Sequence, residues 1–314
     1  MTGCEVCALL KGIHIMKLSC DPRDYIVPFC HEKSEPLRLD SLPTKVSKVY
    51  DSKKHYRKLM DEFSEELHDL QRILYADSRY ALLLIFQGMD TAGKDGAIRH
   101  VMTGVNPQGC QVHSFKQPST EELAHDYMWR TNKRLPMRGH IGIFNRSYYE
   151  EVLIVKAVPG VLEGQSLPDE CVGHESFWSD RYQDIVRHED FLHRNGTRVL
   201  KFFLHLSKEE QRKRLLSRAE EADKNWKISP TDLKSRAQWD DFQQVYAECL
   251  DQTSHPTAPW YSIPADSKRN ARLIISHIVV ETLKSLPIEY PKPDEKQLAE
   301  VEKVRRVLSE QGGD

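Results

Sequence analysis

The 314-residue sequence has no surplus of charge of either sign. Its 45 lysines and arginines face 47 acidic residues, which leaves a formal net charge of -2. Proteins that bind polyanions through their overall charge are usually strongly basic. We therefore expect no nucleic-acid partner, and any phosphate binding has to come from cations gathered locally.

Long apolar runs are also missing. No stretch approaches the ~20 apolar residues that span a bilayer, and the N-terminus lacks the charged start and apolar core of a signal peptide. Internal repeats and low-complexity linkers are absent as well. We expect a cytoplasmic protein with no membrane partner.

The sequence has no disulfide framework. Seven cysteines are an odd number, scattered through a long chain, which favours reduced thiols. Cys4 and Cys7 form a C-x-x-C pair, and Cys20 and Cys30 follow it, so a zinc site is an alternative. The second pair is spaced more widely than in common zinc ribbons, and reduced thiols remain the favoured interpretation.

A glycine-rich loop after an apolar run is the most informative stretch. Residues 81–87 are almost all apolar, as in a parallel strand covered on both faces. Gly88, Gly93 and Lys94 then satisfy G-x-x-x-x-G-K, in which backbone N–H groups surround an anion and the lysine reaches its phosphates. Because a helix is expected to follow, its N-terminal dipole would favour the anion further.

One position departs from the usual phosphate loop. The residue after the lysine is normally Ser or Thr, which holds Mg²⁺, but here it is Asp95. A second carboxylate, Asp90, lies inside the loop, so two acids are candidates for binding the metal. A chance glycine loop is the alternative, and the flanking strand and helix argue against it.

Strand and helix patterns alternate along the chain. An amphipathic helix is predicted within 47–75, and further strands are predicted at 110–115, 140–144, 197–206 and 260–264. Further helices are predicted from 119 to about 132, from 175 to 194, from 208 to about 221, from 229 onward and from 268 to 283, and the tail after 291 is helical or frayed. The alternation predicts an α/β protein, a three-layer αβα sandwich on a mostly parallel five-stranded sheet.

The third predicted strand ends on an unexpected residue. A strand that finishes beside a phosphate loop normally presents an acid to the metal, yet Asn145 stands at this place. A neutral amide can only polarise or orient a metal-bound water, which leaves Asp90 to supply the missing charge.

A basic helix is predicted late in the chain. Its acidic neighbours are too few to pair with all its cations, so either a solvated surface or a lid over phosphates would explain them. We favour the lid, because the preceding strand ends at the same edge of the sheet as the phosphate loop. The cations are Lys208, Arg212, Lys213, Arg214 and Arg218.

Five motifs together resemble the polyphosphate kinase 2 family. They are GMDTAGKDG at 88–96, VNPQG at 105–109, FKQPS at 115–119, RGHIGIFNRSYYEEV at 138–152 and APWYSIPAD at 258–266. The resemblance covers about residues 45–290. It divides the chain into an N-terminal arm (1–45), a P-loop phosphotransferase domain (46–290) with a lid at about 207–235, and a C-terminal tail (291–314).

The resemblance implies a P-loop kinase fold similar to thymidylate kinase and a reversible reaction that depends on Mg²⁺, with Mn²⁺ as an alternative. Phosphoryl groups would pass between inorganic polyphosphate and adenine nucleotides, with guanine nucleotides as further candidates. Many members have Asp-Arg-Ser where this chain has Asn145-Arg146-Ser147, and the asparagine form resembles the subgroup that uses both AMP and ADP. A homo-oligomer, dimer or tetramer, is expected.

The predicted site combines the loop with the positions that the family motifs mark. Asp90 is the predicted metal ligand. For Tyr149, a place in the apolar core is the alternative to a role at the site. The predicted catalytic residues are Asp90, Lys94, Asn145, Arg146 and Glu150. The predicted phosphate- and substrate-binding residues are Gly88, Thr91, Ala92, Gly93, Asp95, Gly96, Lys116, Arg130, Arg134, Tyr149, Arg212, Arg214 and Arg218.

Two other functions fit the same residues. One is an ATP-dependent nucleotide kinase on the same fold, and the other is a non-catalytic polyphosphate-binding protein. A loop lysine beside two carboxylates argues against the second, because binding alone needs no metal site.

Overall fold

The structure is a computed structural model that describes residues 18, 20–29, 35–223, 225–227 and 230–311. Cys4, Cys7 and Cys30 of the zinc alternative lie outside these residues. No helix in the described part of the chain is long and apolar enough to cross a membrane.

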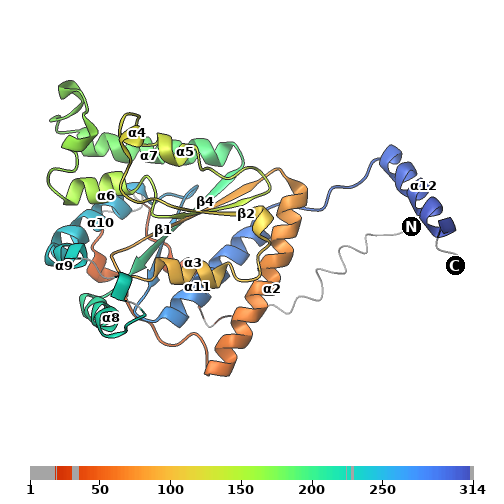
Figure 1. Cartoon of the computed structure of the whole chain (residues 1–314), viewed down its shortest axis with the longest axis horizontal. Coiled ribbons are helices and arrows are strands. Elements are labelled where there is room, and N and C mark those ends of the chain that lie inside the picture. The colour runs from red at the N-terminus through yellow and green to blue at the C-terminus, as the bar shows by residue number, and fades with distance from the viewer. Residues whose placement is uncertain (1–17, 19, 30–34, 224, 228–229, 312–314) are drawn as a thin grey trace.

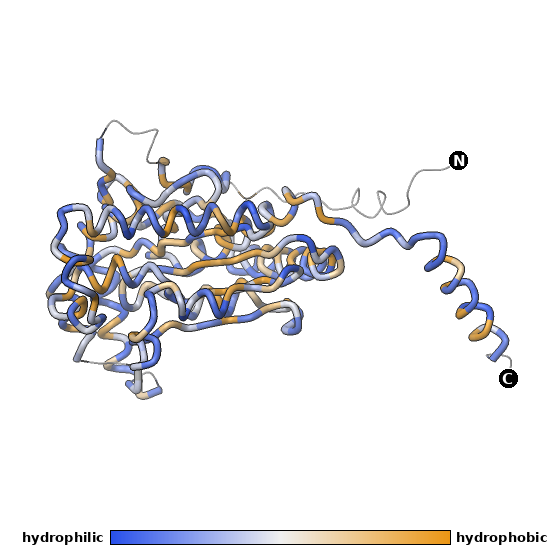
Figure 2. Tube along the Cα trace, turned by 90° about the horizontal axis from the view of Figure 1, so that it is seen from above, coloured by the Kyte–Doolittle hydropathy of each residue, from blue (hydrophilic) through white to orange (hydrophobic). Residues whose placement is uncertain are grey.

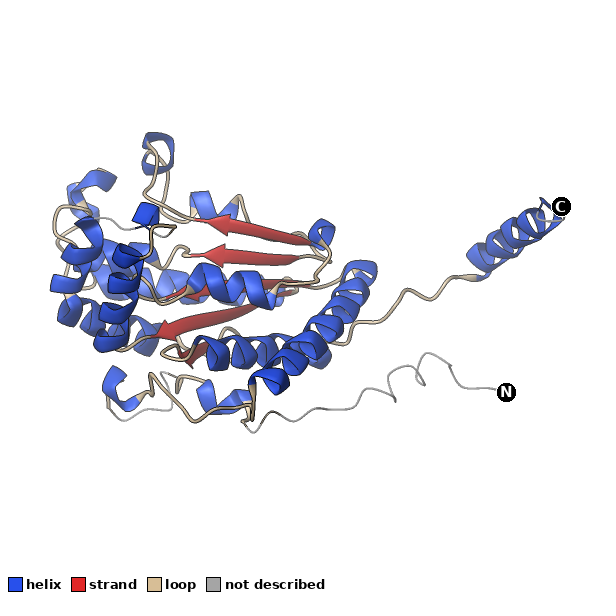
Figure 3. Ribbon diagram, turned by 60° about the horizontal axis from the view of Figure 1, so that its bottom comes forward, coloured by secondary structure: helices blue, strands red, loops and turns tan. Residues whose placement is uncertain are grey.

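A single five-stranded sheet forms the centre of the molecule. Its strand order is β2-β3-β1-β4-β5, and every neighbouring pair is parallel, so the predicted fold class is confirmed. Figure 3 shows the strands pointing the same way, with their carboxyl ends at one edge. The strands are β1 (Ala81–Gln87), β2 (Cys110–Ser114), β3 (Ile141–Asn145), β4 (Thr197–His205) and β5 (Trp260–Pro264).

Helices cover both faces of the sheet and make the outer two layers (Figure 1). Strand β1 alternates between the two cores: Leu82 and Leu84 pack on one side, and Leu83 and Ile85 on the other. Figure 2 shows this apolar interior between more polar helices. The first face carries α2 (Lys53–Asp77), α3 (Lys94–Val101) and α11 (Lys268–Ser285), and the second carries α6 (Glu150–Ala157), α7 (Phe177–Arg194) and α10 (Trp239–Thr253).

Some helices differ from their predictions. Helix α6 was not predicted. The helix predicted from Ser119 onward is two short helices, α4 (Thr120–Leu123) and α5 (Trp129–Asn132). The capping box of Ser119 does form, but the Asp126 side chain accepts from the amide of Met128 at 3.0 Å and turns the chain between the two helices.

The predicted lid region also contains a break. The helix predicted from residue 229 is interrupted, because α9 (Pro230–Ala237) ends before α10 begins at Trp239. Helix α8 (Lys208–Glu220) precedes α9, and Arg236 of α9 donates to the carbonyl oxygen of Lys208 at 2.7 Å. This hydrogen bond ties the two lid helices together.

The segment predicted as an N-terminal arm packs on the domain where the structure describes it. Val27 is fully buried, and its amide donates to the carbonyl oxygen of Trp260 at 2.8 Å. Further along, the Thr44 hydroxyl donates to Asp266 at 3.1 Å. Ile26 and Val27 therefore lie along the outer edge of β5, and Thr44 contacts the turn that follows this strand.

The C-terminal tail contains a helix that stands away from the domain in all three overall views (Figures 1–3). Helix α12 (Glu295–Gln311) is exposed along its whole length, including Val301. It therefore contributes nothing to the described core.

We predict that Ile143→Ala lowers the free energy of unfolding by about 2–4 kcal/mol, because it leaves a cavity beside a fully buried central strand. Val301→Ala on the exposed helix α12 is the matched control and should change it by less than about 0.5 kcal/mol. Chemical denaturation measures both. Equal effects would show that the sheet is not the stable centre.

Candidate phosphate-binding site

The glycine loop connects β1 to α3 and requires unusual backbone angles. Gly88 has φ 149°, and a Cβ there would lie 2.9 Å from the carbonyl oxygen of Leu204 at the end of β4. Gly93 has φ 104° just before the helix. Thr91, a β-branched residue, is held at φ 65°, where such residues are rare. The loop is therefore a strained turn folded closely against β4.

The Lys94 ammonium lies inside this turn. Its Nζ donates to the carbonyl oxygen of Gly88 at 2.5 Å and more weakly to that of Met89 at 3.4 Å. Burial, followed by the nearby Arg146 guanidinium, lowers the pKa of Lys94 to about 8. An anion in the loop would offer this cation a better partner than neutral carbonyl groups.

A cavity of about 640 Å³ opens in front of the loop. The residues that line it include eight cationic side chains and only two carboxylates, Asp90 and Asp95. They come from the loop, from the segment after β2, from the end of β3 and from α3, α8 and α11. The cations are Lys94, Arg99, Lys116, Arg146, Arg214, Arg218, Lys268 and Arg272. A nearly neutral chain thus gathers a strongly positive cavity.

Strand β3 ends against the loop through Asn145. Its Nδ2 donates to Asp95 Oδ1 at 2.5 Å, across the space between β3 and α3. The next residue, Arg146, donates to Asp90 Oδ1 at 3.3 Å and to Glu150 Oε2 at 3.0 Å. Glu150, and to a lesser degree Asp90, raises the pKa of Arg146 above its ordinary value, so the guanidinium remains charged.

The two loop carboxylates suit a magnesium ion that also binds phosphate. Among the described residues, no group of three His, Cys, Asp or Glu side chains could hold a metal ion. Asp90 and Asp95 both line the cavity, and Mg²⁺ in phosphate sites commonly takes one or two carboxylates with water and phosphate oxygens. The residues present fit such an ion.

The three predicted lid arginines of α8 have different surroundings. Arg218 is partly exposed and lines the cavity. Arg214 also borders the cavity but is buried, and it donates to the carbonyl oxygens of Thr91 and Ala92 at 3.1 and 3.0 Å. Arg212 lies outside the cavity lining and pairs with Glu209 at 2.9 Å. Positions 214 and 218 are one turn apart, whereas 212 points elsewhere.

Three other predicted binding side chains also lie outside the cavity lining. Arg130 is buried, where it pairs with Glu151 at 3.2 Å and donates to the carbonyl oxygen of Lys116 at 2.8 Å, so it supports the wall that carries Lys116. Tyr149 is fully buried in the core beneath the site, as its alternative interpretation held. Arg134 is exposed.

The remaining predicted residues are found at or beside the cavity. Gly88 and Glu150 do not line it, but they accept from Lys94 and Arg146 respectively. The predicted residues that line it are Asp90, Thr91, Ala92, Gly93, Lys94, Asp95, Gly96, Lys116, Asn145, Arg146, Arg214 and Arg218.

Three cations of the cavity were not predicted from the sequence. Arg99 lies on α3, and Lys268 and Arg272 lie on the first turns of α11. Lys268 and Arg272 are spaced by four residues, the spacing that places two side chains on one helix face. Two cations at this spacing, directly after the last strand, would have indicated that the start of α11 faces the phosphate site.

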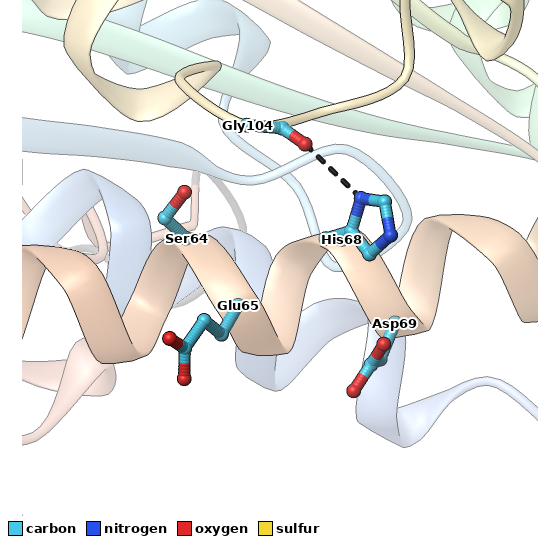
Figure 4. A pocket seen from close by; sticks show the side chains of 5 residues that line it. All are labelled: Ser64, Glu65, His68, Asp69 and Gly104. Carbon is cyan, nitrogen blue, oxygen red and sulfur yellow. Dashed lines mark hydrogen bonds between the residues drawn. The ribbon is translucent and has the colours of Figure 1, made fainter.

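A second hollow of about 340 Å³ lies between α2 and the turn that follows α3 (Figure 4). The His68 ring faces the carbonyl oxygen of Gly104 at 3.1 Å, while Glu65 and Asp69 point away from it. No lysine or arginine lines this hollow, so it is unsuited to phosphate.

The parallel sheet, the phosphate loop and the cationic cavity define a protein of the P-loop kinase class. The model of the polyphosphate kinase 2 family matches residues 50–291, which is most of the chain. The chain therefore belongs to the polyphosphate kinase 2 family.

Individual relatives agree with this assignment. The chain is 53% identical to the ADP-polyphosphate phosphotransferase of Rhodopseudomonas palustris, over 88% of this chain and 96% of that protein. It is 43% identical to the AMP/ADP-polyphosphate phosphotransferase of Meiothermus ruber, over 74% and 82%. The crystal structure of polyphosphate kinase 2 from Arthrobacter aurescens matches with a TM-score of 0.81 and 33% identity, covering 93% of this chain and 99% of that one.

We predict that the affinity for tripolyphosphate falls by up to about tenfold between pH 7 and pH 9. The pKa of Lys94 is about 8, so its cation is present below that pH and is lost above it. Isothermal titration calorimetry measures the change. Lys94→Met should bind more weakly at pH 7 and lose most of the pH dependence, and an unchanged profile in this variant would contradict the role of Lys94.

Proposed function

We propose that this protein transfers phosphoryl groups between inorganic polyphosphate and nucleoside mono- and diphosphates, reversibly and with Mg²⁺. The cavity carries the proposal, because eight cations and two carboxylates surround a phosphate loop. The activities in the names of the relatives support it. Reversibility follows from the chemistry, since one phosphoanhydride bond breaks as another forms.

Phosphoryl transfer needs alignment and charge neutralisation more than covalent help. The loop amides and Lys94 would hold the phosphoryl group that moves. Arg146, fixed between Asp90 and Glu150, would neutralise charge that develops on the transferring oxygens. No separate general base is needed, because the attacking phosphate oxygen is already anionic.

Mg²⁺ would be held by Asp90, with Asp95 as a second carboxylate, and Mn²⁺ suits the same oxygen ligands. When bound, the ion neutralises phosphate charge and aligns the reacting oxygens. Asp95 already accepts a hydrogen bond from Asn145, which orients its carboxylate toward the end of β3. Asp90 keeps Arg146 beside it at the cavity edge.

We predict that Asp90→Asn removes most of the activity and raises the Mg²⁺ concentration for half-maximal rate by roughly tenfold or more, because a charged metal ligand is lost. A magnesium titration of the initial rate measures this. Asp95→Asn serves as the comparison. If Asp90→Asn kept the wild-type magnesium requirement and Asp95→Asn did not, Asp95 would be the principal ligand.

The cavity extends beyond the phosphate loop in a way that suits a long anion. Arg218 of α8 and Arg272 of α11 belong to the same lining, together with Lys268. A polyphosphate chain would meet several of these cations at once, whereas a nucleotide brings at most a few phosphates. This wall should therefore contribute mainly to binding of the donor.

We predict that Arg218→Gln raises the KM for polyphosphate several-fold and changes the KM for the nucleotide by less than about twofold. Arg212→Gln is the matched control on the same helix, and it should leave both constants near wild type because Arg212 pairs with Glu209 outside the cavity. Initial rates at fixed ionic strength measure both constants. Equal effects of the two variants would contradict the assignment of the α8 face.

Acceptor choice centres on Asn145, at the end of β3. An aspartate there would face the Asp95 carboxylate and add negative charge beside an anionic acceptor. A neutral side chain relaxes this repulsion, so acceptors with one or two phosphates become usable in one site. One of the two relatives is named for ADP and the other for both AMP and ADP, which supports ADP as an acceptor and is consistent with use of AMP.

We predict that the purified protein converts AMP to ADP and then ADP to ATP with polyphosphate as the only donor, and that Asn145→Asp changes the ratio of the two rates. Chromatography of products, in a preparation free of adenylate kinase, follows both steps. ADP without ATP, or no product from AMP, would refute the two-step proposal. Transfer only when ATP is supplied as donor would instead indicate an ATP-dependent nucleotide kinase.

We also propose a cytoplasmic location, which free thiols at Cys20, Cys110, Cys171 and Cys249 support. A homo-oligomer, dimer or tetramer, stays a prediction that light scattering of the purified protein would test.

A further inference from the structure

A lysine and a glutamate are buried together in the layer beneath the site. Lys201, in the middle of β4, and Glu189, on α7, are both fully buried, and their side chains meet at 2.7 Å. The Lys201 ammonium also donates to the hydroxyl of Tyr149 at 3.0 Å and to the carbonyl oxygen of Thr253 at 2.7 Å. All three of its N–H donors are therefore used.

The carboxylate is equally well satisfied. Tyr148 and Tyr149 donate their hydroxyls to Glu189 Oε1 at 2.8 and 2.9 Å, while Lys201 occupies Oε2. An ion pair buried this deeply seldom stabilises a fold more than apolar side chains of similar volume would. The complete satisfaction of a charged pair therefore calls for an explanation other than stability.

The explanation lies in what the two tyrosines hold. They occupy the positions between Arg146 and Glu150, where the chain leaves β3 and begins α6. Arg146 has φ 64°, a left-handed conformation that a non-glycine residue keeps only where its surroundings impose it.

Contacts at Arg146 and after it fix this conformation. The Arg146 amide itself donates to the carbonyl oxygen of Phe86 on β1 at 3.0 Å. After it, the Tyr149 amide donates to the Ser147 hydroxyl at 3.1 Å, and the Tyr149 ring is anchored by Glu189 and Lys201. The buried pair is thus the deep end of a chain of contacts that ends at the cavity edge.

We propose that Lys201 and Glu189 are positioning residues for the reaction. Through Tyr149, and with help from Tyr148, they hold the start of α6 in place, so that the Arg146 guanidinium reaches Asp90 and Glu150. This inference rests on the proposed phosphotransfer function. It adds a role for a buried pair that does not line the cavity.

Tyr149→Phe tests the link, because it removes the hydroxyl that joins α6 to the pair and keeps the ring. We expect kcat with polyphosphate and ADP to fall by roughly tenfold or more, with the KM for ADP within about twofold of wild type. Hydrogen exchange of the peptide spanning residues 145–152 should become faster. Tyr182→Phe removes a hydroxyl from another buried tyrosine, on α7 but outside this network, and should leave kcat and that exchange rate unchanged.

A second variant separates positioning from folding. In Lys201→Met/Glu189→Gln both charges are removed together, so no charge is left unpaired and we expect a folded protein with a melting temperature close to wild type. Because Tyr149 loses both charged groups that anchor its hydroxyl, kcat should fall as in Tyr149→Phe, and a wild-type kcat in this variant would contradict the proposal. Lys201→Met alone leaves the Glu189 carboxylate unpaired, and it should lower both thermal stability and kcat.

Failure of the positioning role and failure of the proposed function would give different results in these experiments. A wild-type protein that transfers no phosphate from polyphosphate would refute that function. An active wild type, with Tyr149→Phe at wild-type kcat and unchanged exchange over 145–152, would overturn the positioning role. A lower melting temperature in that case would show that the network serves the fold alone.

Discussion

The mutual repulsion of cations around one cavity is the constraint on which the rest of this structure depends. A chain with nearly balanced charge brings eight cationic side chains together around this cavity. The fold restrains several of them locally: Arg146 lies between Asp90 and Glu150, and Arg214 pairs with Glu210. Burial, and after it the nearby Arg146 guanidinium, lowers the pKa of Lys94. A polyanionic substrate would relieve the repulsion, so the same arrangement favours its binding.

The parallel sheet makes this gathering possible. Strands β1, β3, β4 and β5 all end at one edge, so side chains far apart in sequence meet there. The phosphate loop folds so closely on β4 that only a glycine fits at position 88. Arg214 then joins α8 to this loop by donating to the carbonyl oxygens of Thr91 and Ala92, so the lid helix and the loop form one unit. A movement of α8 would therefore shift the loop backbone at Thr91 and Ala92.

Local sequence patterns were sufficient for the sheet, the loop and the family, because apolar runs and glycine spacing report on structure within a few residues. They were insufficient where a side chain's partner is distant in sequence. From the sequence, Arg130 and Tyr149 were both predicted to bind substrate. In the fold, Arg130 pairs with Glu151, and the Tyr149 hydroxyl donates to Glu189. The lid is an intermediate case: helical spacing separates Arg218 from Arg212, but only the fold shows which face meets the cavity.

In the proposed function, the cationic cavity moves phosphoryl groups directly from polyphosphate to a nucleotide. Phosphorus NMR of the purified protein with polyphosphate, ADP and Mg²⁺ tests it most directly, because donor and product phosphates have separate resonances. We expect the ATP γ-phosphate signal to grow as polyphosphate is consumed, and Lys94→Met to slow this by about a hundredfold, or roughly 3 kcal/mol of transition-state stabilisation. Polyphosphate that binds but remains intact, or equal rates in the two proteins, would contradict it.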